Sequence, residues 1–190
     1  MRGLRSSLAA AAILLGTLPA LAADADPPDV ADTPADTYEK MGFYLRGDLG
    51  WSFLEWGGGA DDSALAVGGG AGYRFNDNLR TDLRVDWAGD YDVGGGNDLA
   101  VTTVLGNMYF DWANSSIFTP YVGAGVGYGW ATFDGPASDD DGFAYALQAG
   151  VGIDLTENIV LDAGYRFRDV MISGSDPMEH QFLLGARFEF

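Results

Sequence analysis

The last segment of the chain alternates strictly between two kinds of residue. Between residues 180 and 190, the even-numbered positions from 182 onward are apolar, and the odd-numbered positions carry most of the polar groups. The segment from Leu79 to Trp87 does the same, with Arg80, Asp82, Arg84 and Asp86 on one face. Successive side chains of a β-strand point to opposite faces, so this pattern predicts two-faced strands and excludes helices.

Segments with this period recur from residue 42 onward. Each is near the roughly 9–11 residues that a tilted strand needs to cross a bilayer. We expect eight strands: Phe43–Phe53, Ala64–Phe75, Leu79–Trp87, Leu99–Trp112, Phe118–Thr132, Phe143–Leu155, Ile159–Asp169 and His180–Phe190.

The connections between these strands are of two kinds. Three are tight turns of turn-forming residues, at 76–78, 113–116 and 156–158. The other four are predicted as longer, acidic loops: Leu54–Asp62, Gly89–Asp98, Phe133–Gly142 and Val170–Glu179. This alternation is typical of an up-and-down, antiparallel transmembrane β-barrel with short periplasmic turns and longer extracellular loops.

The polar face is predicted to line the barrel interior. It is rich in glycine, which weakens a solvent-facing strand but makes room inside a narrow barrel. It also holds every arginine after residue 5 and no lysine, and arginine suits enclosed, paired sites. The predicted interior network is Arg46, Asp48, Arg74, Arg80, Asp82, Arg84, Asp86, Asp111, Asp154, Asp162, Arg166, Arg168, Arg187 and Glu189.

Aromatic residues on the apolar face gather at the two ends of the strands. Trp51, Trp87 and Trp130 fall at one end, while Phe43 and Trp112 fall at the other, with aliphatic residues between. Two aromatic girdles around an aliphatic band match the two interfaces of a bilayer. The alternation therefore indicates a membrane barrel with its apolar face outward.

The first residues have the features of an export signal. Arg2 and Arg5 precede an apolar run, and Ala20 and Ala22 provide small residues for cleavage. We expect residues 1–22 to be a cleaved signal peptide and residues 23–41, rich in Asp, Ala and Pro, to be a flexible periplasmic linker. The barrel is then expected over residues 42–190, exported to the bacterial outer membrane.

The net charge of −18 argues against nucleic acid as a partner, because phosphates need Lys and Arg. The chain holds no cysteine, which excludes a thiol nucleophile and a cysteine metal site. No cofactor and no metal are expected.

Several motifs resemble those of a known family. They are YLRGDLG (44–50), GGAGYRF (69–75), GNMYFD (106–111) and TPYVGAGVGY (119–128). They resemble the small surface-antigen barrels of the opacity and porin-like group, especially the major outer-membrane proteins of α-proteobacteria. The final Phe190, with Phe188 before it, is similar to the terminal signal that barrel-assembly machinery recognises in such proteins. The resemblance implies roles in envelope integrity, surface exposure, adhesion or weak permeability, and no catalytic residues.

Three motifs could suggest other functions. The glycines at 123–129 alternate within a strand, unlike a dinucleotide-binding loop. The run Asp139–Gly142 departs from the spacing of an EF-hand. His180 is the only histidine, and the position two residues on, where lipid A deacylases carry Ser, is Phe182. We therefore expect no enzyme.

Two functions remain open at the level of sequence. One is a non-enzymatic barrel that supports the envelope and displays acidic loops to an unknown surface ligand. The alternative is a narrow porin-like channel for ions or small solutes. Eight strands leave room mainly for side chains, which favours the first. The expected partners are outer-membrane lipid, lipopolysaccharide and the barrel-assembly machinery.

Overall fold

The computed structural model describes residues 40–190 apart from 57–59, 93–97, 136–137 and 173–177. These residues belong to one compact unit, Tyr38–Phe190. The predicted signal peptide (1–22) and all but the last two residues of the predicted linker (23–41) lie outside the described residues. In the described part, no helix is long and apolar enough to span a membrane.

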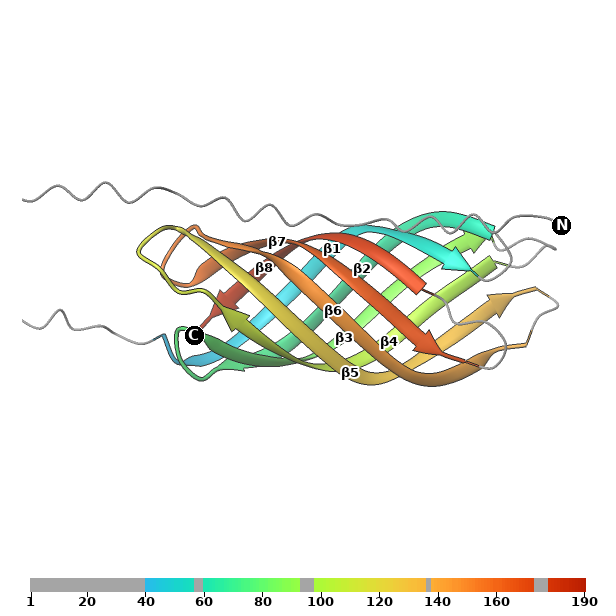
Figure 1. Ribbon diagram of the computed structural model, residues 1–190, viewed down its shortest axis with the longest axis horizontal. Coiled ribbons are helices and arrows are strands. Elements are labelled where there is room, and N and C mark those ends of the chain that lie inside the picture. The colour runs from blue at the N-terminus through green and yellow to red at the C-terminus, as the bar shows by residue number, and fades with distance from the viewer. Residues whose placement is uncertain (1–39, 57–59, 93–97, 136–137, 173–177) are drawn as a thin grey trace, which may run out of the picture. The chain divides into compact units, whose positions relative to one another are not determined.

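Eight antiparallel strands close into a barrel in sequence order, with β1 hydrogen-bonded to β8 (Figure 1). Leu49, for example, lies opposite Val67 on one side and Leu184 on the other. The strands are β1 Gly42–Trp56, β2 Ala60–Arg74, β3 Leu79–Asp92, β4 Asp98–Asp111, β5 Phe118–Asp134, β6 Asp140–Asp154, β7 Ile159–Met171 and β8 Met178–Glu189.

The barrel has two distinct ends. The termini end holds Lys40, Phe190 and the turns at 75–78, 112–117 and 155–158. There Asn76 Oδ1 accepts the amides of Asn78 and Leu79 at 2.9 and 2.8 Å, and Thr156 closes the third turn in the same way. These turns lie where the sequence predicts them, because Asn and Thr side chains satisfy the turn amides.

The opposite end, the loop end, differs from the prediction in extent. The strands continue into the segments expected to be long loops, so that only residues 57–59, 93–97, 135–139 and 172–177 lie between consecutive strands there. The eight predicted strands are all present, and each is longer than predicted at this end.

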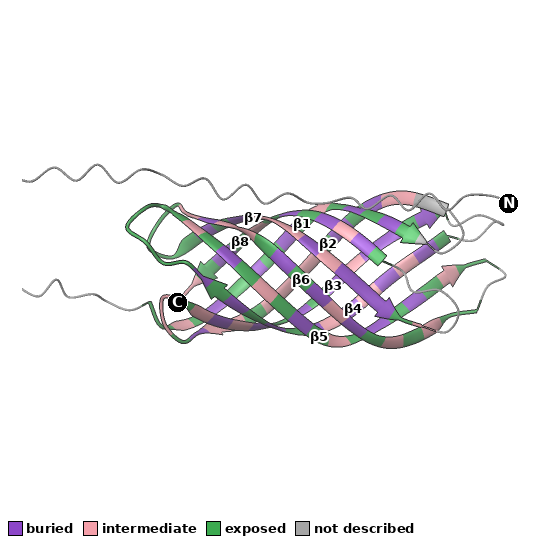
Figure 2. Ribbon diagram, in the orientation of Figure 1, coloured by how far each residue is buried: buried purple, intermediate pink, exposed green. Residues whose placement is uncertain are grey.

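Burial alternates along most of the barrel wall, as the banding in Figure 2 shows. The outward face carries exposed apolar side chains such as Leu83 and Val126. Outward-facing rings form neighbouring pairs at both ends, among them Phe43 with Tyr73 and Tyr128 with Trp130, whose centroids lie 5.0 and 5.4 Å apart. The barrel therefore presents an apolar belt between two aromatic girdles.

The interior changes character along the barrel axis. At the loop end it is largely apolar, packed by Leu54, Tyr91, Leu99, Val101 and Val170. Outward side chains beyond the aromatic girdle are instead acidic and exposed, and they include Glu55, Asp92, Asp98, Asp134 and Asp141. Apolar inside and charged outside is the pattern of a sheet in water, so the strands extend beyond the apolar belt.

A β-bulge in β3 completes this apolar core. The pairing with β4 shifts between Ala88, opposite Val101, and Tyr91, opposite Leu99. Asp90 at the bulge has a φ of 70°, in the left-handed region. The extra residue reverses the alternation and turns Tyr91 inward, where it is fully buried.

Candidate functional site

The structure places all seven arginines after residue 5 inside the barrel, where they are buried. Five strands contribute them: Arg46 from β1, Arg74 from β2, Arg80 and Arg84 from β3, Arg166 and Arg168 from β7, and Arg187 from β8. Each lies on the inward-facing side of its strand. The side chains form three connected groups between the termini end and the loop end.

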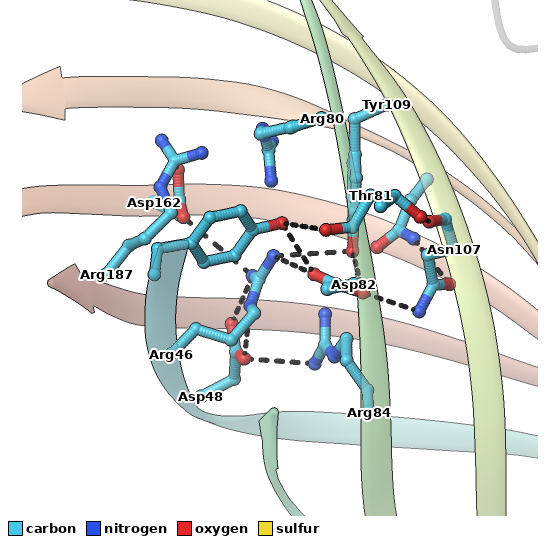
Figure 3. A network of polar contacts seen from close by, with 12 residues as sticks. Arg46, Asp48, Arg80, Thr81, Asp82, Arg84, Asn107, Tyr109, Asp162 and Arg187 are labelled. Atoms are coloured by element: carbon cyan, nitrogen blue, oxygen red, sulfur yellow. Dashed lines mark hydrogen bonds and ion pairs between the residues drawn. The ribbon is translucent and has the colours of Figure 1, made fainter. Parts of the chain in front are cut away.

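The middle group is built around Arg46 and Arg84 (Figure 3). Arg46 donates to both carboxylate oxygens of Asp48, from Nε at 3.0 Å and from Nη2 at 2.7 Å. Arg84 Nη2 lies 3.0 Å from Asp48 Oδ2 and 2.7 Å from Asp86 Oδ1. Asp86 Oδ2 in turn lies 2.9 Å from Arg166 Nη1. Opposite charges therefore alternate across the interior from β1 to β3 and β7.

Asp82 connects this ion-pair chain to uncharged polar groups. Its Oδ1 accepts from Asn107 Nδ2 at 2.8 Å, and its Oδ2 accepts from the Tyr44 hydroxyl at 3.2 Å. Arg46 Nη1 lies 3.4 Å from the same Oδ2 (Figure 3). Gln148 Nε2 then donates to Asn107 Oδ1 at 3.1 Å, which extends the network to β6.

At the loop end, Glu179 is buried within the apolar core. Arg168 donates to both of its carboxylate oxygens, at 2.5 Å from Nε and 2.8 Å from Nη2. The hydroxyls of Tyr91 and Ser52 donate to Oε1 at 2.8 and 3.3 Å. Arg168 also donates to Thr103 Oγ1 at 2.9 Å. Charge-assisted bonds of this kind offset the loss of hydration, so the pair is well satisfied.

At the termini end, Asp111 pairs with two arginines. Arg74 Nη1 and Arg80 Nε lie 2.9 Å from its Oδ2. The Arg80 guanidinium carbon also lies 3.9 Å from the ring centroid of Tyr109 and 4.9 Å from that of Tyr121. Arg187 Nη2 lies 3.3 Å from Asp162 Oδ1. Cation–π contact supplements ion pairing here.

Interior glycines make room for these large side chains. A Cβ at Gly72 would lie 2.3 Å from Cζ of Tyr44. A Cβ at Gly150 or Gly164 would lie 2.6 or 2.7 Å from the Tyr121 hydroxyl. Real Cβ atoms do not approach so closely, so the rings favour glycine at these positions. At Gly72 and Gly150 the carbonyl oxygens of Thr81 and Ala163, 2.3 and 2.5 Å from the added Cβ, do so as well.

Two of the predicted interior residues lie near the termini-end mouth. Glu189 is largely buried and lies 2.8 Å from Arg74 Nη2. Asp154 has a side chain that is 34% exposed and lies 3.4 Å from Lys40 Nζ. Phe188 and Phe190, predicted to act in assembly, are exposed on the outer face, with ring centroids 5.0 Å apart.

Several members of the interior network were not predicted from the sequence. Glu179 and Tyr91 fell in segments predicted as loops, although Glu179 continues the odd-numbered inward face of β8. Ser52, Thr103, Asn107, Gln148 and Gln181 share the inward parity of their strands and could have been found by it. The bulge in β3 left no comparable signal for Tyr91.

His180 and the acidic run at 139–142 mainly contact neighbouring residues of the barrel wall. His180 lies on the outer face, with Nδ1 2.6 Å from the Tyr165 hydroxyl and Nε2 3.7 Å from Glu55. Asp139 accepts from the Phe133 amide at 2.9 Å, and Asp141 accepts from the Tyr128 hydroxyl. Within the described ranges, no three His, Cys, Asp or Glu side chains are grouped to hold a metal ion.

Comparison with known proteins agrees with this architecture. Residues 8–190 match the sequence model of the outer membrane protein beta-barrel domain. An uncharacterised protein of Brucella abortus is 33% identical, over 66% of this chain and 67% of the relative. Outer membrane protein PagN of Salmonella typhimurium is 29% identical, over 56% of this chain and 59% of its own length.

Among solved structures, Neisserial surface protein A has a similar fold. Its TM-score is 0.70 at 24% sequence identity, covering 78% of this chain and 97% of that protein. Together with the family match, this fold is that of an outer-membrane barrel. That the turns at its termini end face the periplasm stays a prediction. The chain belongs to the outer membrane protein beta-barrel domain family.

Proposed function

We propose that the protein is a non-enzymatic, closed barrel that supports the outer membrane and displays an acidic surface outside the cell. The observation that carries this proposal is the apolar core at the loop end. Leu54, Leu99 and Val101 are at most 1% exposed there. Water and ions would have to displace these packed side chains to pass. The bound pair of Arg168 and Glu179 lies within the same core.

The outward face supports the structural role. In a bilayer, the apolar belt would contact the acyl chains of outer-membrane lipid, and the aromatic girdles would lie at the headgroups. The acidic residues beyond the outer girdle would face the lipopolysaccharide layer and the medium. That surface would serve as a surface antigen and as an adhesive surface for partners with positive charge. Assembly by the barrel-assembly machinery belongs to the same proposal.

Single-channel recording of the purified, folded protein in planar bilayers tests the closed barrel. We expect no steady conductance from the wild-type protein. A variant with Leu54→Gly and Leu99→Gly removes two of the four leucine side chains of the core and should conduct, which shows that the assay detects an opened lumen. Large, steady conductance from the wild-type protein would instead establish the porin-like alternative.

A further inference from the structure

The termini end of the barrel holds a cavity of about 200 Å³. Lys40, Arg74, Arg187, Asp77 and Asp154 line it with uncharged neighbours. A smaller hollow of about 100 Å³ shares Lys40 and Arg74 with it. Since the apolar core closes the loop end, we expect this cavity to open at the termini end.

Two guanidinium groups of the cavity have unused donors. Arg74 directs Nη1 to Asp111 and Nη2 to Glu189, while its Nε has no hydrogen-bond partner among the described residues. Arg187 directs Nη2 to Asp162 at 3.3 Å, and its Nη1 has none in the same part of the chain. Their side chains are only 9% and 3% exposed. Buried donors of this kind require an acceptor.

The carboxylates of the cavity and of the adjoining hollow already have donors. Asp77 Oδ1 accepts from the Lys40 amide at 2.9 Å, and Asp154 Oδ1 lies 3.4 Å from Lys40 Nζ. Glu189 Oε1 lies 2.8 Å from Arg74 Nη2 and 3.5 Å from Arg187 Nε. The guanidinium N–H groups of Arg74 and Arg187 that have no partner among the described residues can only donate. They suit a ligand with several acceptor oxygens.

We propose that this cavity binds a small oxyanion of the phosphate class between Arg187 and Arg74. Planar guanidinium groups offer paired N–H donors that match phosphate oxygens. Lys40 adds a third positive charge at the mouth. The anion enters and leaves from the periplasmic side and completes the polar network at that end.

Two sources could supply this chemistry. One is free phosphate in the periplasm, and the other is the headgroup of a phospholipid in the inner leaflet. Both present the same oxygens to the arginines, so the test separates them by the size of the probe.

The test is calorimetric titration of the full, folded protein in uncharged detergent with inorganic phosphate, at constant ionic strength set by chloride. We expect saturable binding. Arg187→Lys keeps the charge but removes the forked donors, and it should weaken binding roughly tenfold, the cost of about one charge-assisted hydrogen bond. Thr119→Trp fills the cavity from its wall without altering a charge and should abolish binding. Ser115→Trp, in an exposed turn outside the cavity, should leave it unchanged.

Dihexanoyl phosphatidylglycerol below its micelle concentration distinguishes the sources. Competition with phosphate, lost in Thr119→Trp, assigns the site to a lipid headgroup, whereas phosphate binding without competition assigns it to the free ion. If the wild-type protein binds neither probe, or if Thr119→Trp binds phosphate as well as Ser115→Trp does, the proposal is wrong. Thr119→Trp decides the matter if Arg187→Lys fails to fold.

Discussion

The Tyr91 hydroxyl donates a 2.8 Å hydrogen bond to Glu179 Oε1 inside the loop end of the barrel. The two residues come from β3 and β8. Glu179 follows the inward parity of β8, whereas Tyr91 faces inward only because of the bulge at Gly89 and Asp90. This bond connects an irregularity in one strand to a buried ion pair on another. It makes the loop end a stable core with its own polar centre.

Replacing Tyr91 with Phe removes this donor and keeps the ring. We expect the free energy of unfolding to fall by about 1.5 kcal/mol, the value of a hydrogen bond to a charged group. Tyr128→Phe is the matched control, because its hydroxyl donates to Asp141 on the exposed outer face. Urea unfolding in lipid vesicles measures both. Equal losses in the two variants would contradict a special role for the buried bond.

The arginines should differ in importance according to the partners they leave behind. In the described chain, the only ion-pair partner of Glu179 is Arg168. Asp48 and Asp86 keep Arg46 and Arg166 if Arg84 is removed. We therefore expect Arg168→Met to cost roughly 3–5 kcal/mol, the range for a buried acid that loses its partner, and Arg84→Met to cost less.

A second substitution tests the reason for this difference. Glu179→Gln in the Arg168→Met background removes the stranded charge and should restore most of the lost stability. The outward-facing Leu83, which is 61% exposed, provides a baseline, since Leu83→Ala should matter little where lipid fills the space. A double variant no more stable than Arg168→Met would show that the charge is not what destabilises it.

The sequence predicted the membrane part of the fold better than the loop end. Through the apolar belt each strand keeps period two, so parity alone placed arginines such as Arg84 and Arg166 inside. At the loop end, acidic residues such as Asp92 and Asp98 resembled loop sequence. They are strand residues that point outward, while Leu54 and Leu99 fill the interior there. The bulge in β3 also reverses which residues face inward, and a period-two sequence pattern does not reveal this change.

The orientation of the barrel can be tested on intact cells. Asp92 lies at the loop end and Asn158 in a turn at the termini end, and both are exposed. Since the native chain has no cysteine, Asp92→Cys and Asn158→Cys each introduce a single thiol. A reagent that cannot cross the membrane should label Asp92→Cys on whole cells and both variants after lysis. Labelling of Asn158→Cys alone on whole cells would reverse the assigned orientation.

The contact between Gly72 and Tyr44 gives the last prediction. A Cβ on Gly72 would lie 2.3 Å from Tyr44 Cζ and 2.3 Å from the Thr81 carbonyl oxygen. Gly72→Ala should therefore lower the free energy of unfolding by about 1–3 kcal/mol, as overpacking does.

Removing the ring should relieve part of this clash. Tyr44→Ala alone leaves a cavity and removes one hydrogen bond to Asp82, so it should also destabilise the barrel. The double variant should lose less stability than the sum of the two single-variant losses, because the added methyl occupies space that the ring has left. Gly47→Ala is the control, since a Cβ at Gly47 meets nothing within 4 Å. Strictly additive losses in the double variant would mean that Thr81 alone, and not the Tyr44 ring, requires glycine at position 72.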